Sequence, residues 1–126
     1  MKSAALLNYQ QGFSLIEVMV AAAILSISLL GFAQAQLMAL HVSEQAYLLN
    51  LADLKNVELA ENFTLCKSRS LCLQQVLTLW KKEVQERFPK GIGQILKLNL
   101  TDYQSKIQWC VAFTKSPSSL NLLFEA

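Results

Sequence analysis

The residues with the clearest chemical potential lie near the N-terminus, where a glycine, a phenylalanine and a glutamate follow at short spacing. Glu17 is the only charged residue in the 28 residues from Phe13 to Leu40, which contain no Lys, Arg, Asp or Pro. Cleavage between Gly12 and Phe13 would create a new α-amine on Phe13. Because residues four apart are neighbours on one face of a helix, that ammonium and the Glu17 carboxylate could neutralise each other.

The same stretch is long and apolar enough to cross a membrane as one helix, since about 20 apolar residues span the hydrocarbon core of a bilayer. A carboxylate placed in hydrocarbon costs roughly 2.5 kcal/mol or more, so Glu17 is a candidate functional residue that needs a partner of opposite charge. We therefore predict that residues 13–40 form a transmembrane segment.

Residues 12–17 read Gly-Phe-Ser-Leu-Ile-Glu and precede the apolar run. This pattern resembles the class III signal of type IV pilins and pseudopilins. The resemblance implies that residues 1–12 are a leader, and that a prepilin peptidase/methyltransferase cuts after Gly12 and methylates Phe13. It also implies that residues 13–40 form the filament core after assembly, and that Glu17 registers the subunit against its neighbour during assembly. Many major pilins carry a helix-kinking proline farther along, where this chain has Gly31-Phe32-Ala33-Gln34.

Two other interpretations of the N-terminal stretch stay open. Ala33-Gln34-Ala35 satisfies the small-x-small cleavage pattern of an ordinary secretory signal peptide. Two features argue against a signal peptide. Such a peptide begins with a positively charged region, but here that region contains only Lys2, and Glu17 would lie inside the apolar core of the peptide. The second alternative is a plain signal anchor, in which Gly12 and Glu17 have no role.

Composition narrows the classes of partner and of chemistry. The formal net charge is +2 and falls to +1 when Lys2 leaves with the leader, so nucleic acid is not expected as the main partner. The single His, together with the lack of Cys-x-x-Cys, Gly-x-Ser-x-Gly and phosphate-binding loop motifs, gives no nucleophile and base pair and no metal cage. We expect a protein that is not an enzyme and binds no cofactor or metal.

All three cysteines lie beyond residue 65, which is typical of a domain exported to an oxidising compartment. Cys66 and Cys72 are six residues apart and flank a polar segment. We predict that they form a disulfide, with Cys110 as a possible alternative partner.

The spacing of apolar residues predicts an α+β fold with helices first and a small sheet last. One helix can run from Phe13 to about Phe63, and a polar loop, 64–70, then leads to a second helix, Leu71–Phe88. Ser70 is the expected N-cap, and Pro89 and Gly91 end the helix. The buried stripe expected in the first helix comprises Leu37, Leu40, Tyr47, Leu48, Leu51, Leu54 and Phe63.

After Gly93 the apolar residues alternate with a period of two, which indicates strands. Three strands are expected in an antiparallel meander, with short links at Thr101-Asp102 and at 115–119, and one face of the sheet packs on the long helix. The alternating apolar residues are Leu96, Leu98 and Leu100, then Ile107, Trp109, Val111 and Phe113, then Leu120, Leu122 and Phe124. Residues 41–126 are predicted to form one small globular domain that includes the second half of the long helix.

The second half of the chain is also similar to the minor pilin family called type IV pilus modification protein PilV. The similarity rests on the cysteine pair before a helix, the tryptophan in that helix, Phe88-Pro89-Lys90-Gly91 and Ile107-Gln108-Trp109. In that family leucine is more common at the position of Phe88, and a small residue at that of Lys90.

The resemblance implies a structural subunit of the tip or initiating complex of a type IV pilus. Before assembly the protein would cross the bacterial inner membrane once, with its C-terminal domain in the periplasm, and it would then reach the pilus at the cell surface. Other minor pilins and the major pilin would be its partners. The alternative is a small pseudopilin of a type II secretion system.

Overall fold

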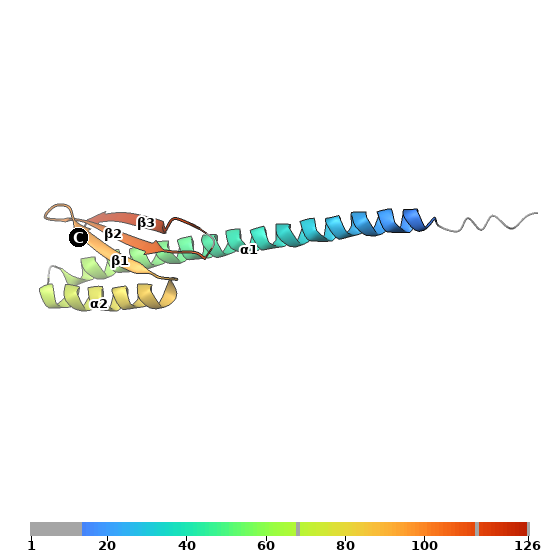
Figure 1. Cartoon of the computed structure of the whole chain (residues 1–126). Coiled ribbons are helices and arrows are strands. Elements are labelled where there is room, and N and C mark those ends of the chain that lie inside the picture. The colour runs from blue at the N-terminus through green and yellow to red at the C-terminus, as the bar shows by residue number, and fades with distance from the viewer. Residues whose placement is uncertain (1–13, 68, 113, 126) are drawn as a thin grey trace, which may run out of the picture. The chain divides into compact units, whose positions relative to one another are not determined.

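A computed structural model describes residues 14–67, 69–112 and 114–125. Gly12 and Phe13, on which the predicted cleavage falls, lie outside the described residues, as do Lys2, Ser68 and Phe113. The elements, in chain order, are α1 (Leu15–Cys66), α2 (Ser70–Arg87), β1 (Ile92–Lys97), β2 (Asp102–Trp109) and β3 (Ser118–Glu125) (Figure 1). The predicted α+β fold, with a long helix, a second helix and a small antiparallel sheet, is confirmed.

The chain divides into two compact units, Met1–His41 and Val42–Ala126. In the first unit the described residues are helical from Leu15 onward, and every described side chain up to Leu40 is exposed. The second unit contains the hydrophobic core, whose first buried member along the chain is Leu48.

The buried stripe in the second half of α1 agrees with the prediction only in part: Leu48 and Phe63 are buried as predicted, but most of the other predicted residues are not. The buried residues recur every three or four positions and are Leu48, Ala52, Asn56, Leu59, Phe63 and Cys66. Tyr47 and Leu54, both predicted to be buried, are 63% and 67% exposed, and Leu37 and Leu40 are also exposed. Each residue turns a helix by about 100°, so a one-residue step from Leu48 already moves Tyr47 off the buried face.

The connection between the helices is shorter than predicted, because α1 continues through Cys66. Lys67 then takes a positive φ of 43°, the left-handed conformation that commonly ends a helix. Arg69, rather than the predicted Ser70, is the N-cap of α2, and its side chain makes no capping hydrogen bond. Ser70 is the first helical residue instead.

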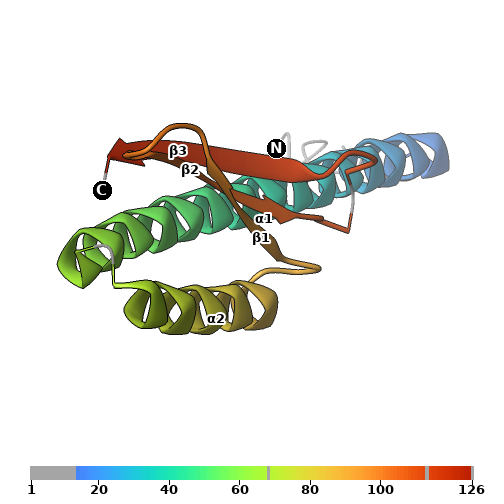
Figure 2. The ribbon, with the colours of Figure 1, turned by 90° about the vertical axis from the view of Figure 1, so that its left-hand side faces the viewer.

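In the second unit α2 lies along the second half of α1, and the sheet covers another side of that helix (Figure 2). Trp80 and Val84 are the buried residues of α2, which confirms Trp80 as a core residue. Trp80 also packs against β1, where its ring occupies the space that a Cβ on Gly93 would need.

The sheet has the order β1-β2-β3, and both pairs are antiparallel, as the meander predicts. The strand boundaries differ from the prediction. Leu98 and Leu100 lie in the hairpin turn, because the amides of Leu98 and Asn99 bond to the Asp102 carbonyl and so close the turn before Asp102 begins β2. β2 ends at Trp109. The next amide, that of Cys110, donates its hydrogen bond to the Pro89 carbonyl at 3.0 Å and not to a neighbouring strand. Val111 is buried beyond the strand end.

Candidate functional site

The start of α1 holds the one described carboxylate of the apolar segment. The carbonyl of Ser14 accepts hydrogen bonds from the amides of Glu17, at 2.8 Å, and Val18, at 3.3 Å. Ser14 therefore stands at the N-cap position with Glu17 three residues later, the Ser-x-x-Glu spacing of a capping box. This spacing is a signal in the sequence that marks the start of the helix. A negative charge in the first turn also suits the positive end of the helix dipole.

The apolar segment that contains Glu17 presents its side chains outward on every face. All described side chains from Ser14 to Leu40 are exposed, including Leu15, Ile16, Met19, Ile27, Leu30 and Phe32. An apolar surface of this extent needs a cover of lipid or of other subunits. By length and composition alone, α1 qualifies as a helix that can cross a membrane.

Two hydroxyl groups within this segment are satisfied inside the helix itself. Ser26 donates to the Ala22 carbonyl at 2.7 Å and Ser28 donates to the Ile24 carbonyl at 2.8 Å. Because lipid offers no hydrogen bonds to polar groups, this back-bonding lets both serines lie in an apolar surrounding.

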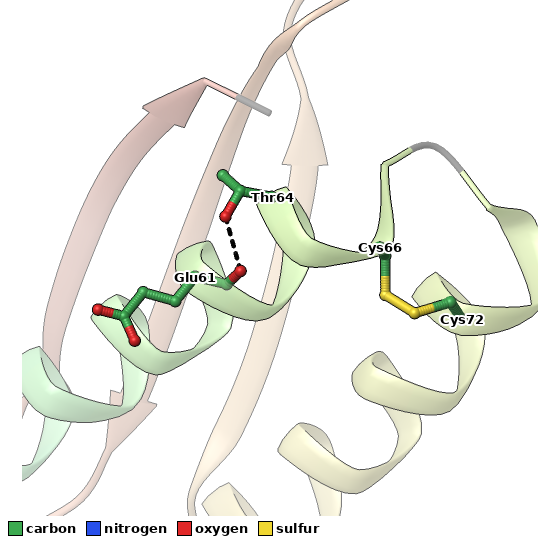
Figure 3. Close-up of a disulfide and its surroundings, with 4 residues drawn as sticks. All are labelled: Glu61, Thr64, Cys66 and Cys72. Atoms are coloured by element: carbon green, nitrogen blue, oxygen red, sulfur yellow. Dashed lines mark hydrogen bonds between the residues drawn. A yellow bond between two sulfur atoms is a disulfide. The ribbon is translucent and has the colours of Figure 1, made fainter.

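Two of the three cysteines lie where α1 ends and α2 begins. A disulfide joins Cys66, the buried last residue of α1, to Cys72 in the first turns of α2, with their Cα atoms 5.6 Å apart (Figure 3). One turn earlier the Thr64 hydroxyl donates to the Glu61 carbonyl at 2.7 Å. Cys110 is a free, half-buried cysteine. The disulfide thus fixes the end of α1 to the beginning of α2.

A second connection between the helices lies farther from the disulfide and is made by Lys55 of α1. Its ammonium pairs with Glu58 at 2.6 Å and with Glu83 of α2. The Lys55 carbonyl also accepts a hydrogen bond from the indole of Trp80 at 3.0 Å. This cluster was not predicted from the sequence, because Lys55 and Glu83 are 28 positions apart and meet only through the packing of the helices.

The pKa values of the cluster reflect this pairing. Burial desolvates the Lys55 ammonium and works to lower its pKa, but hydrogen bonds and attraction from Glu58 and Glu83 outweigh burial and raise the pKa above 10.5. The hydrogen bond from Lys55 lowers the pKa of Glu83 below 4.5. Both groups are therefore charged at neutral pH and hold α2 against α1.

The described residues contain no group of three or more His, Cys, Asp or Glu side chains that could hold a metal ion. The arrangement of the described residues suits attachment to lipid or to other proteins. It consists of an exposed apolar helix, a carboxylate at the start of that helix, and a domain in which a disulfide and an ion pair join the two helices.

Comparison with known protein families identifies a motif in the N-terminal part of the chain. The family described as "Prokaryotic N-terminal methylation motif" matches residues 7–33, which include Gly12, Phe13 and Glu17. No curated protein matches the chain, and no solved structure matches it.

Proposed function

We propose that this chain, whose N-terminal methylation motif indicates a type IV pilin-like or pseudopilin protein, is a minor pilin of the tip or initiating complex of a type IV pilus. It is made as a precursor in the inner membrane, and a prepilin peptidase/methyltransferase cuts after Gly12 and methylates Phe13. The mature subunit then assembles with other minor pilins and with the major pilin, and residues 42–126 face the periplasm before assembly.

The observation that carries this proposal is the pairing of an apolar helix, exposed on all sides from Ser14 to Leu40, with a single carboxylate in its first turn. A membrane anchor alone needs no carboxylate at that position, and the residue is costly in lipid. In a bundle of subunits the α-amine of one Phe13 can pair with Glu17 of a neighbour. This pairing selects one packing of otherwise similar apolar helices.

Processing is the first test. Mass spectrometry of the protein isolated from membranes should find a mature N-terminus at methylated Phe13. A mature chain that begins at Gln36 would establish an ordinary signal peptide and would overturn the proposal.

The assignment to a pilus, rather than to type II secretion, is tested by the partners. The disulfide-tied helix pair, with Trp80 between the helices, supports a minor pilin, because the paired cysteines and this tryptophan are among the features that resemble that family. We expect the protein to co-purify with other minor pilins. Co-purification with secretion pseudopilins instead would assign it to the secretion system.

A further inference from the structure

One end of the second unit carries exposed leucines together with charges of both signs. Here the end of α1 meets the start of β2 and the end of β3, because the ring of Phe63 lies 5.3 Å from that of Tyr103 and 5.5 Å from that of Phe124, centroid to centroid. Phe124 ends the half-buried row of β3, which also contains Leu120 and Leu122. The connection between α1 and α2 and the hairpin between β1 and β2 therefore lie at the same end (Figure 2). Five leucines at this end are more than half exposed: Leu65, Leu71, Leu98, Leu100 and Leu123.

The first part of this surface is basic. We call it the basic patch, and it comprises Leu65, Lys67, Arg69 and Leu71. The disulfide between Cys66 and Cys72 keeps the two cations close to the two exposed leucines. Neither Lys67 nor Arg69 forms an ion pair with another described residue. The basic patch thus presents two unpaired positive charges beside apolar side chains.

The second part of the surface is acidic. We call it the acidic patch, and it comprises Leu98, Asp102, Leu123 and Glu125, which line a hollow of about 420 Å³ together with Phe124. Asp102 and Glu125 stand directly opposite each other in the register of β2 and β3, a position at which like charges repel. Asp102 receives hydrogen bonds from neutral side chains, and no described cation pairs with either carboxylate. The hollow therefore favours a cation from another molecule, surrounded by apolar groups.

We propose that this end of the second unit is a self-complementary docking surface, to which a second copy of this chain binds across a two-fold axis. In a two-fold interface each contact occurs twice, so the basic patch of each copy lies on the acidic patch of the other. Two cations then meet two carboxylates on each side of the axis, and the leucines of both patches are covered.

The arrangement of charge is the reason to choose a second copy as the occupant. Contact between two acidic patches or two basic patches would bring four like charges together and is disfavoured. A different protein would have to supply both complementary patches at the matching spacing, whereas this chain already carries both at one end. The inference rests on the second unit alone and does not depend on the proposed function.

The test uses the full chain in lipid nanodiscs that each hold one copy, so the apolar segments of two copies cannot associate within one membrane. Sedimentation velocity measures association, because two joined discs sediment faster than one. We expect the wild-type discs to pair as their concentration rises. Added salt should weaken the pairing, since ions screen exposed charges.

Two charge-reversal variants make the test specific. Lys67→Glu combined with Arg69→Glu makes both patches acidic, and Asp102→Lys combined with Glu125→Lys makes both patches basic. Each variant alone should pair about tenfold more weakly or worse than wild type, because like charges then face each other. An equimolar mixture of the two variants should pair like wild type, since the acidic end of one fits the basic end of the other.

The matched control is Lys81→Glu combined with Lys115→Glu, which changes the net charge as much as the first variant does, at exposed positions outside both patches. This control should pair like wild type. The second variant keeps the Asp102 backbone carbonyl, which closes the hairpin turn. If that variant still fails to fold, Glu125→Lys alone replaces it and should show a smaller effect of the same sign.

Wild-type discs that stay single at every concentration would overturn the proposal. Charge-reversal variants that pair as strongly as wild type, or a mixture that pairs no better than its separate components, would overturn it as well. Cleavage between Gly12 and Phe13 is measured separately, so failure here is distinguishable from failure of the proposed function.

Discussion

Among single residues, the polar side chains in apolar surroundings are the most informative about assembly and stability. Glu17 lies in the first turn of an apolar helix, where the Ser14 carbonyl bonds to its amide. Asn56 lies fully buried on α1. The proposed function accounts for Glu17, since in a filament an adjacent subunit would supply an ammonium. Asn56 has no such explanation, because neither its amide nitrogen nor its oxygen has a hydrogen-bond partner among the described residues.

Replacement of Glu17 by Val should leave membrane insertion and cleavage after Gly12 intact but impair entry into the pilus-initiating complex. The reason is that Val keeps the helix apolar and removes the only carboxylate of residues 13–40, the group proposed to pair with a neighbour's amine. Processing is measured by mass spectrometry, assembly by co-purification with minor pilins, and the consequence by pilus number on the cell surface.

Glu44→Val is the matched control, because Glu44 is also an exposed glutamate of α1 but lies beyond the apolar segment. Wild-type co-purification and piliation in the Glu17→Val strain would show that this carboxylate has no registering role.

Asn56→Leu should raise the free energy of unfolding by about 1 kcal/mol, because it replaces an unpaired buried amide with an apolar group of similar size. The measurement is the thermal unfolding midpoint. Asn62→Leu, at a half-buried position of the same helix, serves as the control and should change stability less. A lower midpoint for Asn56→Leu would mean that the amide is satisfied inside the folded protein.

At the scale of elements, α2 is held to the second half of α1 at two separate places. The disulfide joins the helices where α1 ends and α2 begins, while Lys55, Glu83 and Trp80 join them farther along α2. The first connection depends on oxidation and the second on pH. Each can therefore be removed without the other.

Glu83→Gln should lower the free energy of unfolding by about 0.5–1 kcal/mol at neutral pH, a modest value because the Glu83 side chain is 42% exposed. The pKa of Glu83 is lowered in the folded state, so its contribution is complete above pH 4.5 and is lost as pH falls through the folded pKa. The raised pKa of Lys55 keeps the other partner charged up to pH 10.5. The difference between wild type and variant should therefore vanish in acid.

The difference in unfolding free energy between wild type and Glu83→Gln is measured by urea unfolding at several values between about pH 3 and pH 8, a range that includes the usual pKa of a carboxyl group. Glu86→Gln, in the exposed Lys82–Glu86 pair with its 3.9 Å separation, should change stability by less than about 0.5 kcal/mol. A pH-independent difference for Glu83→Gln would show that its effect is not electrostatic.

Replacement of both Cys66 and Cys72 by Ala should lower the free energy of unfolding by about 2 kcal/mol, since the bond closes only a short loop in the unfolded chain. Cys110→Ala should retain the disulfide and lose less stability. Non-reducing peptide mapping identifies the linked pair, and a peptide that links Cys110 to Cys66 or Cys72 would contradict this pairing.

At the scale of the whole molecule, all of the buried core residues lie in the second unit, between Leu48 and Val111. We therefore expect a fragment that begins at Val42 to fold without detergent and to unfold cooperatively, within a few degrees of the full chain. Circular dichroism on heating measures this. A fragment without a cooperative transition would show that residues before Val42 contribute to the core.

The sequence by itself determined the features that depend on neighbours along the chain. The methylation motif, the apolar helix, the second helix, the order of the strands and the proposed cysteine pair all follow from short spacings or from periodicity. Such patterns act locally, so they can be read without knowledge of packing. For the same reason the candidate assembly residue, Glu17, was identified from its position among apolar residues.

Tertiary structure alone decided which residues meet. The buried face of α1 passes through Ala52 and Asn56 rather than Tyr47 and Leu54, because the sheet and α2 select one of several partly apolar faces. The pairing of Lys55 with Glu83 and the half-buried row of β3 likewise depend on segments far apart in the chain. Long-range packing also set the end of β2. The alternation of apolar residues continues to Val111, but the strand stops at Trp109, because the Cys110 amide donates its hydrogen bond to Pro89.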